Sequence, residues 1–296
     1  MRDAFSGYHP IVNFTYFALV LTCSMVFMHP ICLTISLVFA FSYSVQLNGK
    51  RAIKFNLLYM LPMLLVTALI NPSFNHEGVT ILLYLRSGNP LTLESITYGI
   101  AAATMFVAII CWFSCYNAVM TSDKFIYLFG RVIPALSLVL SMVLRFVPKF
   151  KAQFAVVSEA QRCIGRDILN GSPAARLMHG IRILSMMTTW MLENGIETAA
   201  SMRSRGYGLR GRTAFSLFRF DRRDRSALAF LTLIGGYVIT GAYAGAMHVR
   251  YFPSMRGVEL SAYPATVFGA YALLCALPIL INVREDLRWK HSQSSI

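Results

Sequence analysis

The chain begins with a long stretch that contains no Asp, Glu, Lys or Arg: residues Ala4–Gly49 read AFSGYHPIVNFTYFALVLTCSMVFMHPICLTISLVFAFSYSVQLNG. The stretch is 46 residues long, and about 20 apolar residues suffice for a helix to cross the hydrocarbon core of a bilayer. His29-Pro30 lies near its middle, and a residue that precedes proline avoids the helical conformation. The stretch therefore predicts two membrane helices, over about residues 11–28 and 31–46, joined by a tight turn.

The rest of the chain holds four more uncharged runs, each long enough for one membrane helix: Phe55–His76, Ser95–Ser122, Ser226–Val249 and Leu260–Val283. Of the 296 residues, 56% are hydrophobic and 14% charged, whereas soluble domains carry about 25% charged residues. This composition excludes an ordinary soluble enzyme, and aromatic residues at 13% exclude a disordered chain. The predicted fold class is all-α: a polytopic membrane protein with about six transmembrane helices.

The distribution of basic residues predicts the orientation of these helices. With the N-terminus inside, the segments on the cytoplasmic side hold 24 Lys and Arg residues and the outer segments hold three, Arg86, Arg250 and Arg256. Cytoplasmic loops of membrane proteins are enriched in Lys and Arg, so both termini are expected in the cytoplasm. The same rule accounts for the formal net charge of +14 without a nucleic-acid partner.

Residues 120–226 interrupt the membrane pattern and hold 17 basic and seven acidic residues. From Phe150 onward, Phe154, Val157 and Ile164 recur at helical spacing, which predicts an amphipathic helix. Asn170–Pro173 then breaks the chain, and Ser172 and Pro173 suit the N-cap and first position of a second helix.

We expect the second helix to run to about Arg205 and to end at Gly206. Upstream, Phe125–Val147 is apolar but contains Arg131 and Pro134, so we favour a helix packed beneath the bundle over a seventh span. Two or three long cytoplasmic helices result, and the predicted organisation is 1–119, 120–226 and 227–296. The basic helices could bind anionic lipid, connect the membrane parts or dock a soluble partner.

Catalytic signals are weak throughout the chain. Five of the six cysteines lie in predicted spans, and Cys111 and Cys115 have no His or carboxylate nearby, so buried packing is predicted instead of a metal site. No phosphate-binding GxxxxGK[ST] motif occurs, and no cofactor is expected. Gly241–Gly245 predicts a close-packing face toward a helix of the same chain or another membrane subunit. The alternative function is a polytopic membrane enzyme such as a lipid-modifying transferase.

Seven segments carry short motifs: His9-Pro10, Leu69–Gly78, Pro90–Glu94, Arg145–Pro148, Glu159–Gln161, Ser204–Tyr207 and Phe220–Asp224. In their order and spacing, these segments resemble the transmembrane T component of energy-coupling factor (ECF) transporters. The resemblance implies a non-catalytic scaffold and coupling subunit in the cell membrane of a bacterium or archaeon. Its implied partners are two ATP-binding cassette ATPases and one substrate-binding S component, for uptake of a vitamin or transition-metal ion. Specificity belongs to the S component, so the sequence names no substrate.

The resemblance also implies which residues couple to the ATPases. Each of two crossing helices carries one set at its end. The first set is Gln161, Arg162, Gly165 and Arg166, and the second is Ser204, Arg205, Gly206 and Tyr207. Ile164 stands where the family carries the central arginine of the first motif, so either Arg162 or Arg166 substitutes, or that contact is apolar. Arg145 is expected at the start of the cytoplasmic helix, with Pro148 setting a bend. It is either a hinge and helix-crossing anchor or one of the basic residues that mark the cytoplasmic side.

Overall fold

A computed structural model describes residues 3–84, 90–130, 133–167, 172–209, 218–257 and 261–294. These residues are predominantly helical, which confirms the all-α fold class. They form two compact units, one from residues 1–125 together with 218–296, and the other from residues 126–217.

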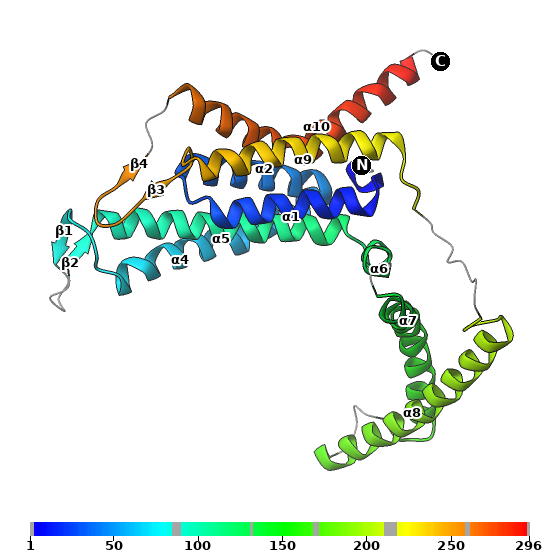
Figure 1. The fold of residues 1–296 in the computed structure, drawn as a ribbon. Helices are drawn as coiled ribbons and strands as arrows, with labels where there is room; N and C mark the ends of the chain where they lie inside the picture. The colour runs from blue at the N-terminus through cyan, green and yellow to red at the C-terminus, as the bar shows by residue number, and fades with distance from the viewer. Residues whose placement is uncertain are drawn as a thin grey trace. The chain divides into compact units, whose positions relative to one another are not determined.

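The first unit contains the apolar helices and two small antiparallel strand pairs (Figure 1). Its elements are η1 (Phe5–Gly7), α1 (Pro10–Val26), α2 (Pro30–Asn48), α3 (Lys50–Phe55), η2 (Asn56–Met60), α4 (Leu61–Phe74), β1 (Ile81–Tyr84), β2 (Pro90–Thr92), α5 (Leu93–Val119), α9 (Arg222–Tyr243), β3 (Val249–Arg250), β4 (Arg256–Gly257) and α10 (Ala262–Ser294). Helix α6 (Ser122–Gly130) leads into the second unit, which holds α7 (Pro134–Cys163) and α8 (Pro173–Ser204).

The turn predicted at His29-Pro30 separates α1 from α2, as expected. Each of these helices begins with the same pair, a histidine at the N-cap and a proline at the first helical position. The Nδ1 atoms of His9 and His29 accept hydrogen bonds from the amides of Ile11 and Ile31, at 3.3 and 3.2 Å. Proline costs no hydrogen bond there, because the first amides of a helix lack an internal partner.

Five helical segments among the described residues are long and apolar enough to cross a membrane: Pro30–Asn48, Ala52–Phe74, Leu93–Val119, Arg222–Tyr243 and Ala262–Gln293. They coincide with five of the six spans predicted from the sequence. The remaining predicted span corresponds to α1, which is apolar but only 17 residues long. At about 1.5 Å per residue, α1 is roughly 26 Å long, the lower limit for crossing the hydrocarbon core.

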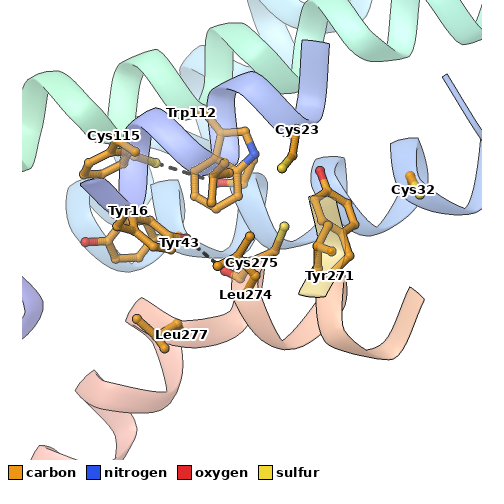
Figure 2. Close-up of a cluster of buried hydrophobic side chains, with 14 of the residues drawn as sticks. Tyr16, Cys23, Cys32, Tyr43, Trp112, Cys115, Tyr271, Leu274, Cys275 and Leu277 are labelled. Carbon is orange, nitrogen blue, oxygen red and sulfur yellow. Dashed lines mark hydrogen bonds between the residues drawn. The ribbon is translucent and has the colours of Figure 1, made fainter. Parts of the chain in front are cut away.

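The core of the first unit is aromatic and holds a few hydrogen-bonded polar groups (Figure 2). The indole nitrogen of Trp112 on α5 donates to Ser36 Oγ on α2 at 3.0 Å, and Ser36 Oγ lies 2.8 Å from Ser24 Oγ on α1. The hydroxyl of Tyr271 on α10 lies 3.2 Å from Ser24 Oγ. Buried polar groups need such partners, so this network aligns four helices with one another.

Helix α10 contains Pro278 and bends part-way along its length (Figure 1). A proline inside a helix removes one amide donor and displaces the preceding turn, which exposes carbonyl oxygens. Tyr16 of α1 donates its hydroxyl to the carbonyl of Cys275 at 3.2 Å, three residues before the proline. This bond attaches α1 to the bend. The five cysteines predicted within spans are all buried, and Cys163 is exposed.

Gly241 provides the close approach that the glycine pattern predicted, and its neighbour is in the same chain. A Cβ added at Gly241 would lie 2.7 Å from both methyl groups of Val267 on α10. Gly245 has a different role, because it ends α9 with a φ of 83°. Only Gly241 is therefore a packing residue in this pair.

The second unit corrects the expected start of the first cytoplasmic helix. Helix α7 begins at Pro134 instead of near Arg145, and Pro148 lies inside it. The apolar residues upstream of Arg145 continue the helix, and an internal proline costs only local hydrogen bonds when its neighbours remain helical. Arg145 is exposed on the middle of α7. Arg131 and the predicted break at Asn170-Gly171 lie outside the described residues.

Candidate functional site

Helix α8 ends at the predicted second coupling motif. Ser172 caps its start by accepting from the amide of Ala175 at 3.3 Å, and Pro173 is its first residue, as predicted. At its other end, the amide of Gly206 donates to Arg203 O and that of Tyr207 to Met202 O, both at 3.0 Å. This pair of bonds is a Schellman motif, and Gly206 has the left-handed φ of 79° that the motif requires.

Helix α7 ends in the same way at the predicted first coupling motif. The amide of Gly165 donates to Arg162 O at 3.0 Å, and that of Arg166 to Gln161 O at 2.9 Å. Gly165 has a φ of 78°. The two motifs can therefore be superposed residue by residue, and Ile164 takes the C-cap position that Arg205 takes in α8. The Ile164 side chain is 60% exposed.

This backbone geometry alone does not distinguish a coupling site. Helix α9 ends with the same two bonds, from Gly245 to Ala242 O and from Ala246 to Gly241 O. What differs is the side chain at the C-cap: Arg205 on α8, Ile164 on α7 and Ala244 on α9. The glycines fix where each side chain projects, and the C-cap residue supplies the chemistry.

The charged residues of the α7 end are not equivalent. Arg162 Nε lies 3.5 Å from Asp167 Oδ2, and the Arg162 side chain is 72% exposed. Exposed ion pairs of this kind contribute about 0–1 kcal/mol, so Asp167 offsets the charge of Arg162 without immobilising it. Arg166 is exposed as well. In contrast, Gln161 Nε2 donates to Met186 Sδ of α8 at 3.8 Å, so Gln161 contributes to the packing between the helices.

Helices α7 and α8 cross (Figure 1), and the contact of Gln161 with Met186 places the C-terminal end of α7 at the middle of α8. Ile183 and Met187 of α8 are buried in this unit. Ser204 lies 18 residues beyond Met186, which is about 27 Å along a helix that rises about 1.5 Å per residue. The two predicted coupling motifs therefore lie at separate places along α8.

A second row of apolar side chains on α8 remains exposed. Leu177, Ile181 and Leu184 are each more than half exposed, and Met178 and Met191 are exposed as well. Beside Gly180 this row forms an open groove of about 560 Å³, lined by Pro173, Arg176, Leu177, Gly180, Ile181 and Leu184. An exposed apolar face of this kind is typical of a surface that binds another protein. Methionine side chains make such a face adaptable.

Sequence reasoning missed a polar cluster near the N-terminus. Lys124 is only 7% exposed and donates to two backbone carbonyls, and Asp224 is 4% exposed and accepts from the amide of His9. Burial lowers the pKa of Lys124, and the Asp3 carboxylate partly opposes that shift. His9 and Asp224 lie in two segments that each resemble the family, which was the available signal. The sequence pattern did not predict that these two residues contact each other.

The sequence of the chain is similar to sequences of transporter subunits. The energy-coupling factor transporter transmembrane protein EcfT of Listeria innocua is 28% identical to this chain over 232 residues. That alignment covers 72% of this chain and 85% of the Listeria protein. The chain is a relative of the EcfT proteins. The EcfT of Lactobacillus helveticus is 31% identical over 113 residues, which cover 38% of this chain and 41% of that protein.

The EcfT of Lacticaseibacillus paracasei is 30% identical over 105 residues, or 35% of this chain and 40% of its own length. The chain thus aligns with about two fifths of the length of the EcfT proteins of Lactobacillus helveticus and Lacticaseibacillus paracasei. No protein-family model matches the chain. The described residues include five apolar helices long enough to cross a membrane, and the chain is similar to EcfT. The chain is therefore a multi-pass membrane protein of the cell membrane.

Proposed function

We propose that the chain is the scaffold and coupling subunit of an ECF-type ABC importer, and that its partners hydrolyse the ATP. The observation that carries the proposal is that α7 and α8 cross and expose their C-cap residues, Ile164 and Arg205, at two ends about 27 Å apart along α8. Two separate ends suit two ATPase subunits, one at each motif. The substrate-binding S component, which would select a vitamin or a transition-metal ion, is the third partner.

The end of α8 is the stronger of the two docking sites in this proposal. Arg205 is exposed at the C-cap, and a guanidinium presents five donors to carboxylates and carbonyls in a partner groove. Ser204 and Tyr207 flank it, and Gly206 fixes the direction in which Arg205 leaves the helix. At the end of α7, Ile164 offers an apolar contact at the same position. Arg162 and Arg166 lie to either side of it.

The remaining parts of the proposal concern orientation and hinge. Basic residues are in excess in the segments assigned to the cytoplasm, which supports two cytoplasmic termini. In this orientation residues 120–226, between the membrane parts 1–119 and 227–296, lie on the same side as the ATPases. Pro148 lies inside α7, where a missing amide weakens the helix, so it stays our candidate hinge, with Arg145 beside it. The membrane helices of the first unit would hold the S component.

The test is co-purification of the chain with the two ATPases and the S component encoded in the same genome. Arg205→Glu should insert normally, because Arg205 lies outside the spans, but should weaken ATPase binding. Breaking one side of a buried charged pair costs about 2–5 kcal/mol, which is roughly 30-fold to several-thousand-fold in affinity. Arg203→Glu is the matched control, because two residues turn a helix by about 200° and direct that side chain to the opposite face.

The α7 motif gives the complementary experiment. Arg162→Glu and Arg166→Glu should each have a smaller effect than Arg205→Glu, since the position equivalent to Arg205 is Ile164. Ile164→Arg should strengthen ATPase binding, because it supplies the missing donor at an exposed C-cap. If the Arg205→Glu protein assembles and transports normally while the Arg162→Glu protein does not, the stronger docking site lies at the end of α7 and not at the end of α8. If the unmodified chain retains no ATPase at all, the proposed function is wrong.

A further inference from the structure

The first residues of the chain, Asp3–His9, are held by helices that are distant in sequence. Asn282 of α10 donates from Nδ2 to Asp3 Oδ1 at 2.6 Å, and its Oδ1 accepts from the amides of Ala4 and Phe5 at 2.9 and 3.2 Å. Tyr43 of α2 donates its hydroxyl to Asp3 Oδ2 at 3.2 Å. The Phe5 ring is fully buried. The segment is therefore fixed on the C-terminal part of α2 and on the middle of α10.

The same segment holds the point where the chain leaves the first unit. Lys124, next to the boundary after residue 125, donates from Nζ to Ser6 O at 2.6 Å and to Val119 O at 2.9 Å. When the Asn13 amide is oriented to satisfy its neighbours, its oxygen accepts from Lys124 Nζ at 3.0 Å and its nitrogen donates to Phe5 O. A buried ammonium with these acceptors is a strong anchor for the start of α6.

The segment also holds the point where the chain returns. Asp224, in the first turn of α9, accepts from the amide of His9 at 3.0 Å through Oδ1 and from the amide of Asp221 at 3.1 Å through Oδ2. The rings of His9 and Phe220 meet edge to face with centroids 5.1 Å apart. The Arg223 guanidinium carbon lies 4.2 Å from the centroid of the Tyr8 ring, a cation–π contact.

We propose that Asp3–His9 form an N-terminal clamp that ties both chain connections of residues 126–217 to the membrane helices, with Lys124 and Asp224 as positioning residues. The role of the clamp, which is to pass movement of α7 and α8 to the membrane helices, rests on the proposed function. Its physical basis is the short distance along the backbone: Lys124 binds the carbonyl of Ser6, and Asp224 binds the amide of His9, three residues on. Displacement of one connection must therefore strain the other.

The clamp is tested by hydrogen–deuterium exchange on the full-length chain in lipid nanodiscs. Lys124→Met keeps an unbranched side chain, one atom shorter, and removes the ammonium; Lys54→Met makes the same change at an exposed lysine. Loss of a charged hydrogen bond should speed local opening about tenfold or more. In Lys124→Met the faster exchange should include residues 220–226, although the bonds of Lys124 are to Ser6 and Val119. A change confined to residues 119–130 would overturn the clamp.

The reciprocal variant is Asp224→Ala, which should speed the exchange of residues 122–130 by a similar factor. Glu193→Ala is the control, because it removes an exposed carboxylate outside both regions. Arg223 is exposed, and Arg223→Gln removes its cation–π contact with Tyr8. This variant is used if Lys124→Met or Asp224→Ala does not fold. It should produce a smaller change in the same two regions. If neither region responds in Arg223→Gln and Asp224→Ala, the two connections are independent and the clamp is wrong.

The positioning role has a separate readout, transport per ATP hydrolysed by the complete reconstituted complex. Lys124→Met should lower this ratio severalfold while the ATPases remain bound and active. A ratio equal to that of the parent would overturn the positioning role. If the parent complex does not assemble or transport, the proposed function fails, and the exchange experiment still decides whether Asp3–His9 connect the two regions.

Discussion

The packing of α9 against α10 gives a direct test of the fold, through Gly241→Ala. The added methyl group would lie 2.7 Å from Cγ1 and from Cγ2 of Val267, whereas carbon atoms in contact are about 3.5–4.0 Å apart. Valine is restricted in χ1, so Val267 cannot easily rotate away, and the helices must separate by about 1 Å. Overpacking of this kind typically costs about 1–3 kcal/mol.

The assay is thermal unfolding of the purified chain in detergent, followed with a thiol-reactive dye. A Cys163→Ser background removes the exposed thiol, so the signal comes from the five buried cysteines as they become accessible. With a shift of roughly 2–4 °C per kcal/mol, Gly241→Ala should lower Tm by about 2–12 °C.

Gly236→Ala is the matched control on the same helix, because an added Cβ there has no heavy atom within 4 Å. It should leave Tm unchanged or raise it, since alanine favours a helix over glycine. The double variant Gly241→Ala with Val267→Ala should recover part of the loss, because it removes the two methyl groups that clash. A Gly241→Ala protein as stable as the parent, or a Gly236→Ala protein as damaged, would refute the packing argument.

Three further predictions concern topology, nucleotide binding and pH. Cysteines introduced at positions 81–84 and 253–255 should be labelled from outside the cell and those at 218–221 only from inside; outside labelling of 218–221 would reverse the orientation. The isolated chain should neither bind nor hydrolyse ATP in equilibrium dialysis and phosphate-release assays, since its sequence lacks a phosphate-binding loop, and stoichiometric binding would contradict this. Burial lowers the pKa of His9, with the Asp224 carboxylate opposing, so the fold favours neutral His9 and should lose stability as pH falls below about 6.5. His9→Asn, which keeps a capping acceptor, should flatten that part of the Tm profile, and an unchanged slope would exclude His9 as its origin.

The sequence by itself determined where the helices lie and how several of them end. Uncharged runs located the apolar helices, His29-Pro30 located the turn between α1 and α2, and Ser172 and Gly206 marked the two ends of α8. These features depend on hydropathy, capping and backbone conformation over a few residues, so they can be read from a short window. The resemblance of Ser204–Tyr207 to the family motif identified the candidate coupling end of α8 in the same way.

The tertiary structure decided which distant polar groups meet. Asp3 binds Asn282, which is 279 residues away in sequence, and Lys124 binds the carbonyl of Ser6. No periodicity predicts such pairs, because they depend on which helix ends are brought together by packing of the aromatic core. The structure also placed Pro148 inside α7 and Ile164 at the C-cap position of Arg205, since the extent of a helix depends on contacts beyond its own sequence.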